Sequence, residues 1–246
     1  MLDAWYTFPT QIGDHRAFIT YNHGYAEIAE KDKRDFLLKV RVKIKNPTPA
    51  GMSTSEEFPA LSAVDEKLDD SLTKKGAVYV GRITIDGYRY FHFYVDFLEP
   101  VASKTIDNVS KQTSYKLQYS YKKDSAKDGY WKDLYPSSDD WQLIQDMKVL
   151  DALAKNGDIP SKPREVFHWA YFFEMKTANN FVEWAKSVHY KLISIETTDD
   201  KKKVGVRFSH VGTMALEDIT HHTIGLNRKA KEMKGDYDGW ETSVAK

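Results

Sequence analysis

The chain of 246 residues contains no cysteine. Disulfide bonds, thiolate nucleophiles and cysteine metal sites are therefore excluded, and a reducing compartment fits this composition. Hydrophobic residues make up 41% of the chain and aromatic residues 13%, so a real core can form without cross-links. The length allows one large domain or two of ordinary size.

The chain also lacks an excess of charge of either sign, because it has 36 basic and 36 acidic residues. Proteins that bind nucleic acid electrostatically normally carry a basic excess or a basic stripe. We therefore expect an ordinary mixed surface, and direct binding of nucleic acid fits the composition poorly. The segments before and after residue 157 are both near neutral, so charge does not separate their roles.

Long hydrophobic runs are absent as well, since charged residues interrupt every apolar stretch and no segment resembles a membrane span. Residues 1–5 have neither the basic start nor the apolar run of a secretion signal. We expect a cytoplasmic protein that has no membrane partner.

A linker is expected at residues 156–163, where Gly157, Pro160 and Pro163 stand among small polar residues. It follows a helical pattern and precedes a strand pattern. The sequence therefore predicts an N-terminal α+β domain at residues 1–157 and a C-terminal domain at residues 158–246.

The C-terminal half predicts the element order β-α-β-β-α-β. Its first strand, residues 166–173, is apolar or aromatic on both faces, which is typical of a strand buried on both sides. The two helices begin near Thr177 and Thr213, and a turn is expected at residues 198–201. The other strands are expected at residues 192–195, 204–208 and 240–244. This order is that of ferredoxin-like sandwiches.

The N-terminal half predicts an antiparallel sheet with helices. Asp86-Gly87 joins its clearest hairpin, because this dipeptide suits a two-residue turn. Strands are expected at residues 18–22, 36–44, 78–85, 88–97 and 115–121. Helices are expected at residues 58–72 and 103–111, with a last one leading to the linker. The order allows a second ferredoxin-related sandwich.

The segment Gly235–Glu241 ends a long helical pattern. Gly235 suits the left-handed residue that terminates a helix. Asp238-Gly239 is a strong turn dipeptide, and Trp240 then starts an alternating strand.

Three segments of the C-terminal half carry a resemblance to a known family: Arg164–Trp169, Phe208-Ser209 and Gly235–Glu241 with its Tyr-Asp-Gly-Trp run. Together they resemble the bacterial RraB family, regulator of ribonuclease E activity B, over about residues 160–244. The N-terminal half resembles a bacterial domain family of unknown function. The segments that carry this second resemblance are Trp5–Phe8, Val80–Thr84, the aromatic strand after Gly87 and Leu134–Ser137.

The RraB resemblance implies a ferredoxin-like fold and a non-enzymatic role as a regulator or adaptor. It implies a protein partner, an RNase E-type nuclease, which such a regulator binds and inhibits. His168, Tyr237, Asp238, Gly239, Trp240 and Glu241 are the candidate partner-binding or family-signature residues. For Tyr237 and Trp240 a structural role in the core is the favoured hypothesis, and an interface role is the alternative.

Histidines offer few candidates for chemistry. His221 and His222 are adjacent on a helix and point about 100° apart, so they do not readily share one metal ion with His210. We favour solvated or capping histidines there and a hydrogen-bonded core residue at His168. The chain has no Gly-x-Ser-x-Gly, P-loop or Gly-x-Gly-x-x-Gly motif. We expect no catalytic constellation, metal or cofactor.

An aromatic strand forms the alternative binding site. Tyr88, Tyr90, His92 and Tyr94 share one face of the strand at residues 88–97, as alternate residues do. Stacked aromatic rings bind bases, so a ligand- or RNA-binding function through this hairpin is the alternative function. Core packing is the favoured explanation, because the strand is aromatic on both faces.

Overall fold

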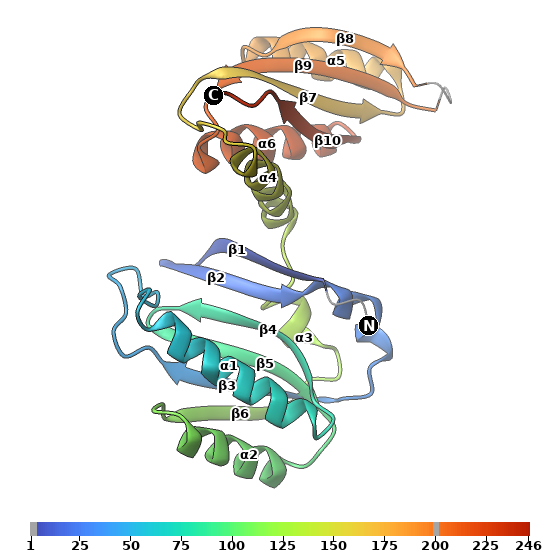
Figure 1. The fold of residues 1–246 in the computed structure, drawn as a ribbon. Helices are drawn as coiled ribbons and strands as arrows, with labels where there is room; N and C mark the ends of the chain where they lie inside the picture. Colours follow the sequence, from blue (N-terminus) through green and yellow to red (C-terminus); the bar gives the residue numbers. More distant parts are fainter. Residues whose placement is uncertain (1–3, 199–201) are drawn as a thin grey trace. The chain divides into compact units, whose positions relative to one another are not determined.

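The computed structural model describes residues 4–198 and 202–246. Its contacts divide the chain into two compact units, Met1–Pro136 and Ser137–Lys246, called unit 1 and unit 2 below. Each contains one antiparallel sheet and packed helices, which confirms the α+β prediction (Figure 1). Most of the expected turn at residues 198–201 lies outside the described residues.

Unit 1 contains a six-stranded antiparallel sheet with the order β1-β2-β4-β5-β3-β6. Its strands are β1 (Trp5–Ile12), β2 (His15–Asn22), β3 (Phe36–Lys43), β4 (Val78–Ile85), β5 (Tyr88–Val95) and β6 (Leu117–Lys123). Its helices are α1 (Phe58–Thr73), α2 (Glu99–Gln112) and the short α3 (Asp128–Trp131), and two 3-10 turns lie at His23–Glu27 and Ala29–Lys31. The sequence prediction missed β1, which pairs along its whole length with β2.

Both faces of the unit 1 sheet are covered. On one face, apolar residues of β3 and β5, among them Val40 and Phe91, pack against α1 and α2 in one cluster. Opposite them lies a group of buried tyrosines. Tyr25 stacks on Tyr94 at 5.7 Å between ring centroids, and Tyr130 meets Tyr25 edge-on at 4.9 Å. The 3-10 turns and the α3 segment therefore close the second face at the Tyr94 end of β5.

Asp124 fixes this second layer. Its carboxylate accepts hydrogen bonds from the Tyr94 hydroxyl at 2.8 Å and from the backbone N–H groups of Asp128 and Gly129. These donors hold the pKa of the Asp124 carboxyl below its ordinary value, although burial acts in the opposite direction. The anion thus anchors α3 beneath β5.

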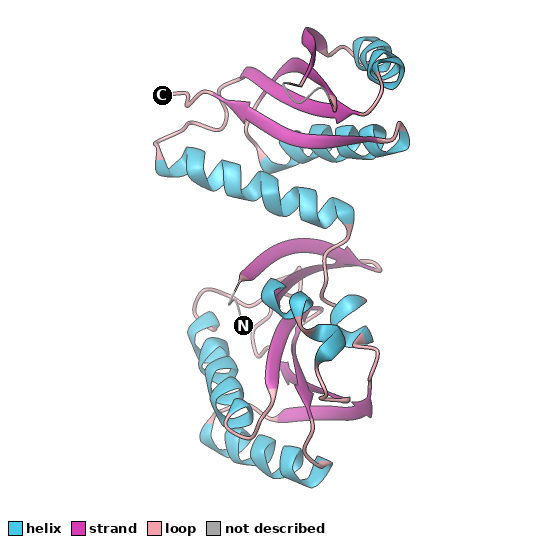
Figure 2. Ribbon diagram, turned by 90° about the vertical axis from the view of Figure 1, so that its right-hand side faces the viewer, coloured by secondary structure: helices cyan, strands magenta, loops and turns pink. Residues whose placement is uncertain are grey.

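Unit 2 has the order β-α-β-β-α-β, preceded by one further helix. Its elements are α4 (Ser138–Lys155), β7 (Arg164–Phe172), α5 (Met175–Ser187), β8 (Lys191–Thr197), β9 (Val204–Gly212), α6 (Leu216–Glu232) and β10 (Gly235–Thr242). The antiparallel sheet has the order β10-β7-β9-β8. Ala170, Phe172 and Val206 of this sheet pack with residues of α5 and α6 in one apolar cluster. Figure 2 shows the helices and strands of the chain by colour.

The boundary expected after residue 157 differs from the boundary of the compact units, which lies between Pro136 and Ser137. Helix α4 packs within unit 2, where Leu153 joins a cluster with Val166, Met214 and Trp240. Ser137 and Asp140 form a capping box that starts this helix. The Gly-Pro-rich segment therefore connects two elements of unit 2.

The C-terminal segment also differs from its prediction. The left-handed residue after α6 is Lys234, with φ of 58°, and Gly235 already begins β10. Gly235 has another reason to be glycine, because a Cβ there would lie 2.3 Å from the Phe172 ring. Asp238 and Gly239 form a β-bulge within one continuous strand, where a turn was expected.

No helix within residues 4–198 and 202–246 combines the length and the apolar character needed to cross a membrane.

Candidate interaction site

Trp240 reaches from β10 to a buried carboxylate of α4. Its indole Nε1 donates a hydrogen bond of 2.9 Å to Asp146, whose side chain is shielded from solvent. The same carboxylate accepts hydrogen bonds from Gln142 and from Thr223 of α6. Burial raises the pKa of Asp146, and the three donors oppose that rise. Trp240 thus joins α4, α6 and β10 and has a structural role.

His168 and Tyr237 form a second buried contact beneath the sheet. Nδ1 of His168 lies 2.8 Å from the Tyr237 hydroxyl, and its Nε2 lies 2.8 Å from Nδ1 of His210 on β9. Burial lowers the pKa of His168 well below its ordinary value, and repulsion from His210 and His222 acts the same way. Burial raises the pKa of Tyr237 well above its ordinary value. The pair is therefore neutral at physiological pH.

The chain of histidines continues to α6. The rings of His210 and His222 stack at 3.7 Å between centroids, and the Tyr190 hydroxyl lies 2.6 Å from Nδ1 of His222. Burial, and then repulsion from His222, lowers the pKa of His210 to about 4. Burial and repulsion from His221 lower the pKa of His222.

These histidines contact one another rather than surrounding a central ion. The ring of His221 is turned 82° from that of His222, and its side chain is exposed. Within the described residues, no group of three or more potential ligands is placed to hold a metal ion. His210, His221 and His222 are a candidate set from the sequence, but no local pattern there connects His168 of β7 with His210 and His222.

The remaining signature residues lie outside this core. Asp238 is exposed at the bulge, and Gly239 has φ of 127°, which suits glycine. Glu241 points away from the helices, and its Oε1 lies 3.4 Å from Nη2 of Arg207 on β9. Only Asp238 and Glu241 of the six signature residues present an exposed side chain.

The sheet face opposite α5 and α6 carries an aromatic stripe. Phe167, Trp169 and Tyr171 of β7 alternate with the core residues of that strand and are only half-buried. The Arg207 guanidinium lies 4.7 Å from the centroid of Phe167 and 5.0 Å from that of Trp169. The expectation that both faces of this strand are largely buried is therefore corrected, because the helices α5 and α6 pack on the other face and the stripe stays half-exposed.

The predicted stacking strand β5 divides into a half-exposed end and a buried end. Tyr88 and Tyr90 are half-buried with their rings 6.1 Å apart, and the Arg41 guanidinium lies 5.4 Å from the Tyr88 centroid. His92 and Tyr94 are at most 1% exposed. They share the face predicted for them, but only Tyr88 and Tyr90 are accessible to a ligand.

His92 lies beside a carboxylate. Its Nε2 is 3.7 Å from Asp133, which also accepts a hydrogen bond of 2.5 Å from Lys39. Burial lowers the pKa of His92, whereas the His92 and Lys39 contacts lower that of Asp133 to about 2. The half-buried carboxylate of Asp133 is therefore paired with Lys39 and lies next to the buried imidazole of His92.

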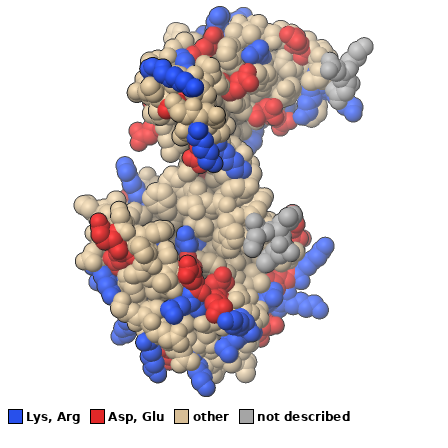
Figure 3. All heavy atoms as spheres, in the orientation of Figure 1, with Lys and Arg blue, Asp and Glu red and all other residues tan. Residues whose placement is uncertain are grey.

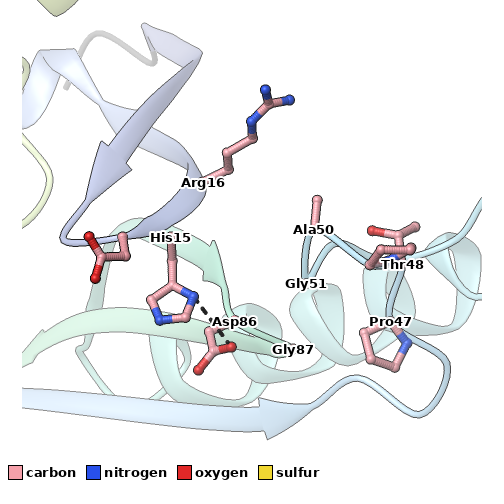
Figure 4. Close-up of a pocket in the computed structure, with 10 residues that line it drawn as sticks. His15, Arg16, Pro47, Thr48, Ala50, Gly51, Asp86 and Gly87 are labelled. Atoms are coloured by element: carbon pink, nitrogen blue, oxygen red, sulfur yellow. Dashed lines mark ion pairs between the residues drawn. The ribbon is translucent and has the colours of Figure 1, made fainter.

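A surface hollow of about 420 Å³ lies at the β4–β5 turn of unit 1 (Figure 4). His15 and Asp86 meet in it at 3.5 Å, and both are largely exposed. The segment around Gly51 closes one side, because the Gly87 N–H donates to the Gly51 carbonyl at 2.9 Å. Because His15 and Asp86 are open to solvent, the hollow does not enclose them as acid–base chemistry requires.

Charge does not mark a site on the face drawn in Figure 3. Lys and Arg are interspersed with Asp and Glu on the visible surface of both units. A basic stripe that would follow a nucleic-acid backbone is absent from this face, consistent with the balanced composition.

Comparison with known proteins identifies both units. The model of a family described as Family of unknown function (DUF695) matches residues 3–135, which is more than half of the chain. The chain belongs to the DUF695 family. In this DUF695 protein, a second family model, described as Regulator of ribonuclease activity B, matches residues 143–242. Both resemblances found in the sequence are thereby confirmed.

Other comparisons with this DUF695 protein are weaker, and no curated protein matches it. A crystal structure of an unknown protein from Galdieria sulphuraria is 9% identical, covers 85% of this chain and 98% of its own, and has a TM-score of 0.23. A putative glycine cleavage system transcriptional repressor is 7% identical with the same coverage and a TM-score of 0.24. Scores this low carry no argument about the fold or function of the DUF695 protein.

Proposed function

We propose that this protein is a non-enzymatic cytoplasmic regulator whose unit 2 binds an RNase E-type endoribonuclease and lowers its cleavage of RNA. The observation that carries the proposal is the match of residues 143–242 to the Regulator of ribonuclease activity B family. The matched range contains the whole β-α-β-β-α-β sandwich and most of α4.

The geometry of the buried polar groups supports a role in binding. Asp146, His168 and Tyr237 have hydrogen-bond partners within unit 2. Catalytic groups need access to a substrate, whereas these side chains connect secondary-structure elements. The partner would therefore meet the exposed surface of the sandwich.

The test is reconstitution with a purified RNase E-type nuclease and a fluorescent RNA substrate. We expect the full chain to bind the nuclease in a pull-down and to slow cleavage in proportion to its concentration. The Asp146→Ala variant should lose this effect if it loosens unit 2, whereas Asp124→Ala, which alters unit 1, should keep it. Unchanged cleavage together with no recovered nuclease would reject the proposal.

A second function is supported by Tyr88 and Tyr90, whose half-exposed rings lie beside Arg41. Aromatic rings next to a guanidinium can stack on bases, so this end of the hairpin is a candidate site for a nucleotide or a short RNA. A ligand that binds the native state raises its melting temperature. Thermal-shift titration should show such a rise that Tyr88→Leu removes, and no rise with any nucleotide or short RNA rejects this function.

A further inference from the structure

The open face of the unit 2 sheet is arranged in rows that cross its strands. In one row Trp169 of β7 is paired with Arg207 of β9, and in a neighbouring row Tyr171 is paired with Gly205. Gly205 in turn pairs with Glu196 of β8. Residues opposite each other in a sheet project from the same face, so the side chains of one row can contact the same ligand.

The Arg207 row already holds a guanidinium. This group lies over Phe167 and Trp169, and its Nη2 approaches the carboxylate of Glu241 at 3.4 Å. Aromatic faces attract cations because their quadrupole is negative above the ring, and the planar guanidinium also stacks. Arg207 therefore shows that this face of the sheet can hold a guanidinium against aromatic rings and beside a carboxylate.

The Tyr171 row also has an aromatic ring and a carboxylate, but no cation of the described residues lies over its ring. Position 205 is glycine, and a Cβ there would lie 3.1 Å from Cε1 of Tyr171, so the tyrosine ring lies over the glycine. Glu196 is exposed beyond it, with no ion pair to another described residue. A hollow of about 450 Å³ is lined by Trp169, Tyr171, Ser194, Glu196, Gly205 and Arg207.

The charges around the hollow select the sign of its occupant. On the β10 side of Tyr171, Asp236 faces the same row and is paired with Lys203 at 3.0 Å. Glu196 lies on the other side, and Glu241 already engages Arg207. The carboxylates of Asp236 and Glu241 are thus paired with cations, and Glu196 is the acidic group of the hollow with no ion pair to a described residue. A phosphate would be repelled by Glu196, whereas a cation would gain this carboxylate and an aromatic face together.

We propose that the hollow over Tyr171 binds an arginine side chain from an extended basic segment of a partner protein. The guanidinium would lie against the Tyr171 ring and pair with Glu196, as Arg207 does with Trp169 and Glu241 in the adjoining row. Arginine is preferred to lysine because its planar group both stacks on a ring and meets a carboxylate with two N–H donors. This inference goes beyond the proposed nuclease function and stands for any partner with such a segment.

The test uses the full chain and a fluorescently labelled peptide of alternating arginine, glycine and serine, followed by fluorescence anisotropy. The same peptide with citrulline in place of arginine keeps the shape and loses the charge, so it should not bind. Glu196→Gln should weaken binding of the arginine peptide about threefold, as expected for one exposed charge pair. Tyr171→Leu should weaken it by a similar factor, of the order of one cation–π contact.

Glu66→Gln is the matched control, because Glu66 is an exposed glutamate on α1 of unit 1. It makes the same change of charge away from the hollow and should leave the affinity unchanged. Thermal unfolding of each variant checks the fold, and Glu196→Gln keeps the test valid if Tyr171→Leu disturbs β7.

Equal weakening by Glu196→Gln and Glu66→Gln, or equal binding of the citrulline peptide, would overturn the inference. So would binding of single-stranded oligouridylate in place of the peptide, lost in Tyr171→Leu and retained in Glu196→Gln. The nuclease assay is separate: peptide binding with no effect on the nuclease rejects the proposed function and retains this site.

Discussion

Unit 1 and unit 2 contain the same arrangement of four strands and two helices, yet they treat the second face of the sheet differently. The strands β3, β4, β5 and β6 occur in the order β4-β5-β3-β6, and β8, β9, β7 and β10 occur in the equivalent order. In unit 1 the second face is buried at the Tyr94 end of β5 beneath tyrosines of added segments, and it stays half-exposed at Tyr88 and Tyr90. In unit 2 it carries the half-exposed stripe of Phe167, Trp169 and Tyr171.

The difference shows that strand order alone does not decide which face is available for binding. The 3-10 turns and α3 bring Tyr25 and Tyr130 over the face that includes Tyr94. Unit 2 instead adds α4 on its helical side, where Asp146 meets Thr223 and Trp240. The first addition hides a sheet face, and the second leaves one open.

Alkaline pH should separate the two units most strongly. Burial is the main cause that raises the pKa of Tyr21, Tyr25, Tyr94 and Tyr130 in unit 1. Their stabilising contribution is full below the unfolded pKa of about 10 and falls as pH rises above it, because only the unfolded chain then ionises. At pH 11 each fully buried tyrosine removes about 1.4 kcal/mol, so the four remove about 6 kcal/mol.

Unit 2 has two half-buried tyrosines whose pKa is raised by burial, Tyr190 and Tyr237, so its alkaline loss should be smaller. Tyrosinate absorbance should rise cooperatively with the unfolding of unit 1, and a protease active at alkaline pH should cut unit 1 first. Simultaneous cleavage of both units would contradict this order.

Replacing Asp146 by alanine should destabilise unit 2 by about 3 kcal/mol, since three buried donors lose their acceptor. The donors are Gln142, Thr223 and the Trp240 indole. Hydrogen exchange followed by mass spectrometry should show faster exchange in peptides of β7 and β10 and unchanged exchange in those of β3 and β5. A loss below about 1 kcal/mol would mean that the network contributes little beyond packing.

Mild acid should act chiefly on unit 2. His210 has a folded pKa of about 4 and an unfolded pKa of about 6.5. Between these values the unfolded chain binds more protons, so the stability present above pH 6.5 is lost as pH falls toward 4. From pH 7 to pH 5 this histidine alone should remove about 2 kcal/mol, and His168 and His222 shift in the same direction.

Unit 1 contains one corresponding histidine, His92, which lies beside Asp133. Hydrogen exchange at the two pH values, corrected for the intrinsic exchange rate, should therefore show the larger loss of protection in β7 and β9. A greater loss in β3 and β5 would reverse the comparison.

The smallest effect is expected for Arg228→Gln. Arg228 pairs with Asp139 of α4 on the surface of unit 2, and its side chain is 70% exposed. Water and salt screen such a pair, so its removal should leave the urea midpoint of unfolding nearly unchanged. Urea titration of this variant and of Asp146→Ala compares how much the surface ion pair and the buried hydrogen bonds of α4 each stabilise unit 2.

Hydrophobic periodicity predicts most helices and strands here because each pattern is local. The pairing of Tyr25 with Tyr94 and Tyr130 is not predictable in this way, since the three come from distant segments. Helix α4 has a clear pattern in the sequence, but no local feature tells which sheet it packs on. Asp146 consequently resembles a solvated helix residue until Trp240 and Thr223 are seen around it.

The candidate sites were predictable to the same extent, because local patterns show which residues share a face but not what covers that face. Alternation placed Tyr88, Tyr90, His92 and Tyr94 on one face, but burial of the last two depends on segments that alternation does not connect to β5. The open stripe on β7 was missed because aromatic residues on both faces are typical of a fully buried strand. Its exposure depends on an absent covering layer, which the strand's own residues do not encode.

The buried carboxylate of Asp146 also determines which segment of the chain can be exchanged between proteins as one folded unit. A segment cut at the Gly-Pro-rich stretch near residue 157 would leave the Trp240 indole and the Thr223 hydroxyl without their acceptor and uncover Val166 and Met214. Gene fusion or domain exchange that preserves this sandwich must therefore carry α4 with it. The recombination point compatible with folding lies ahead of the Ser137 cap, at the junction between the two family matches.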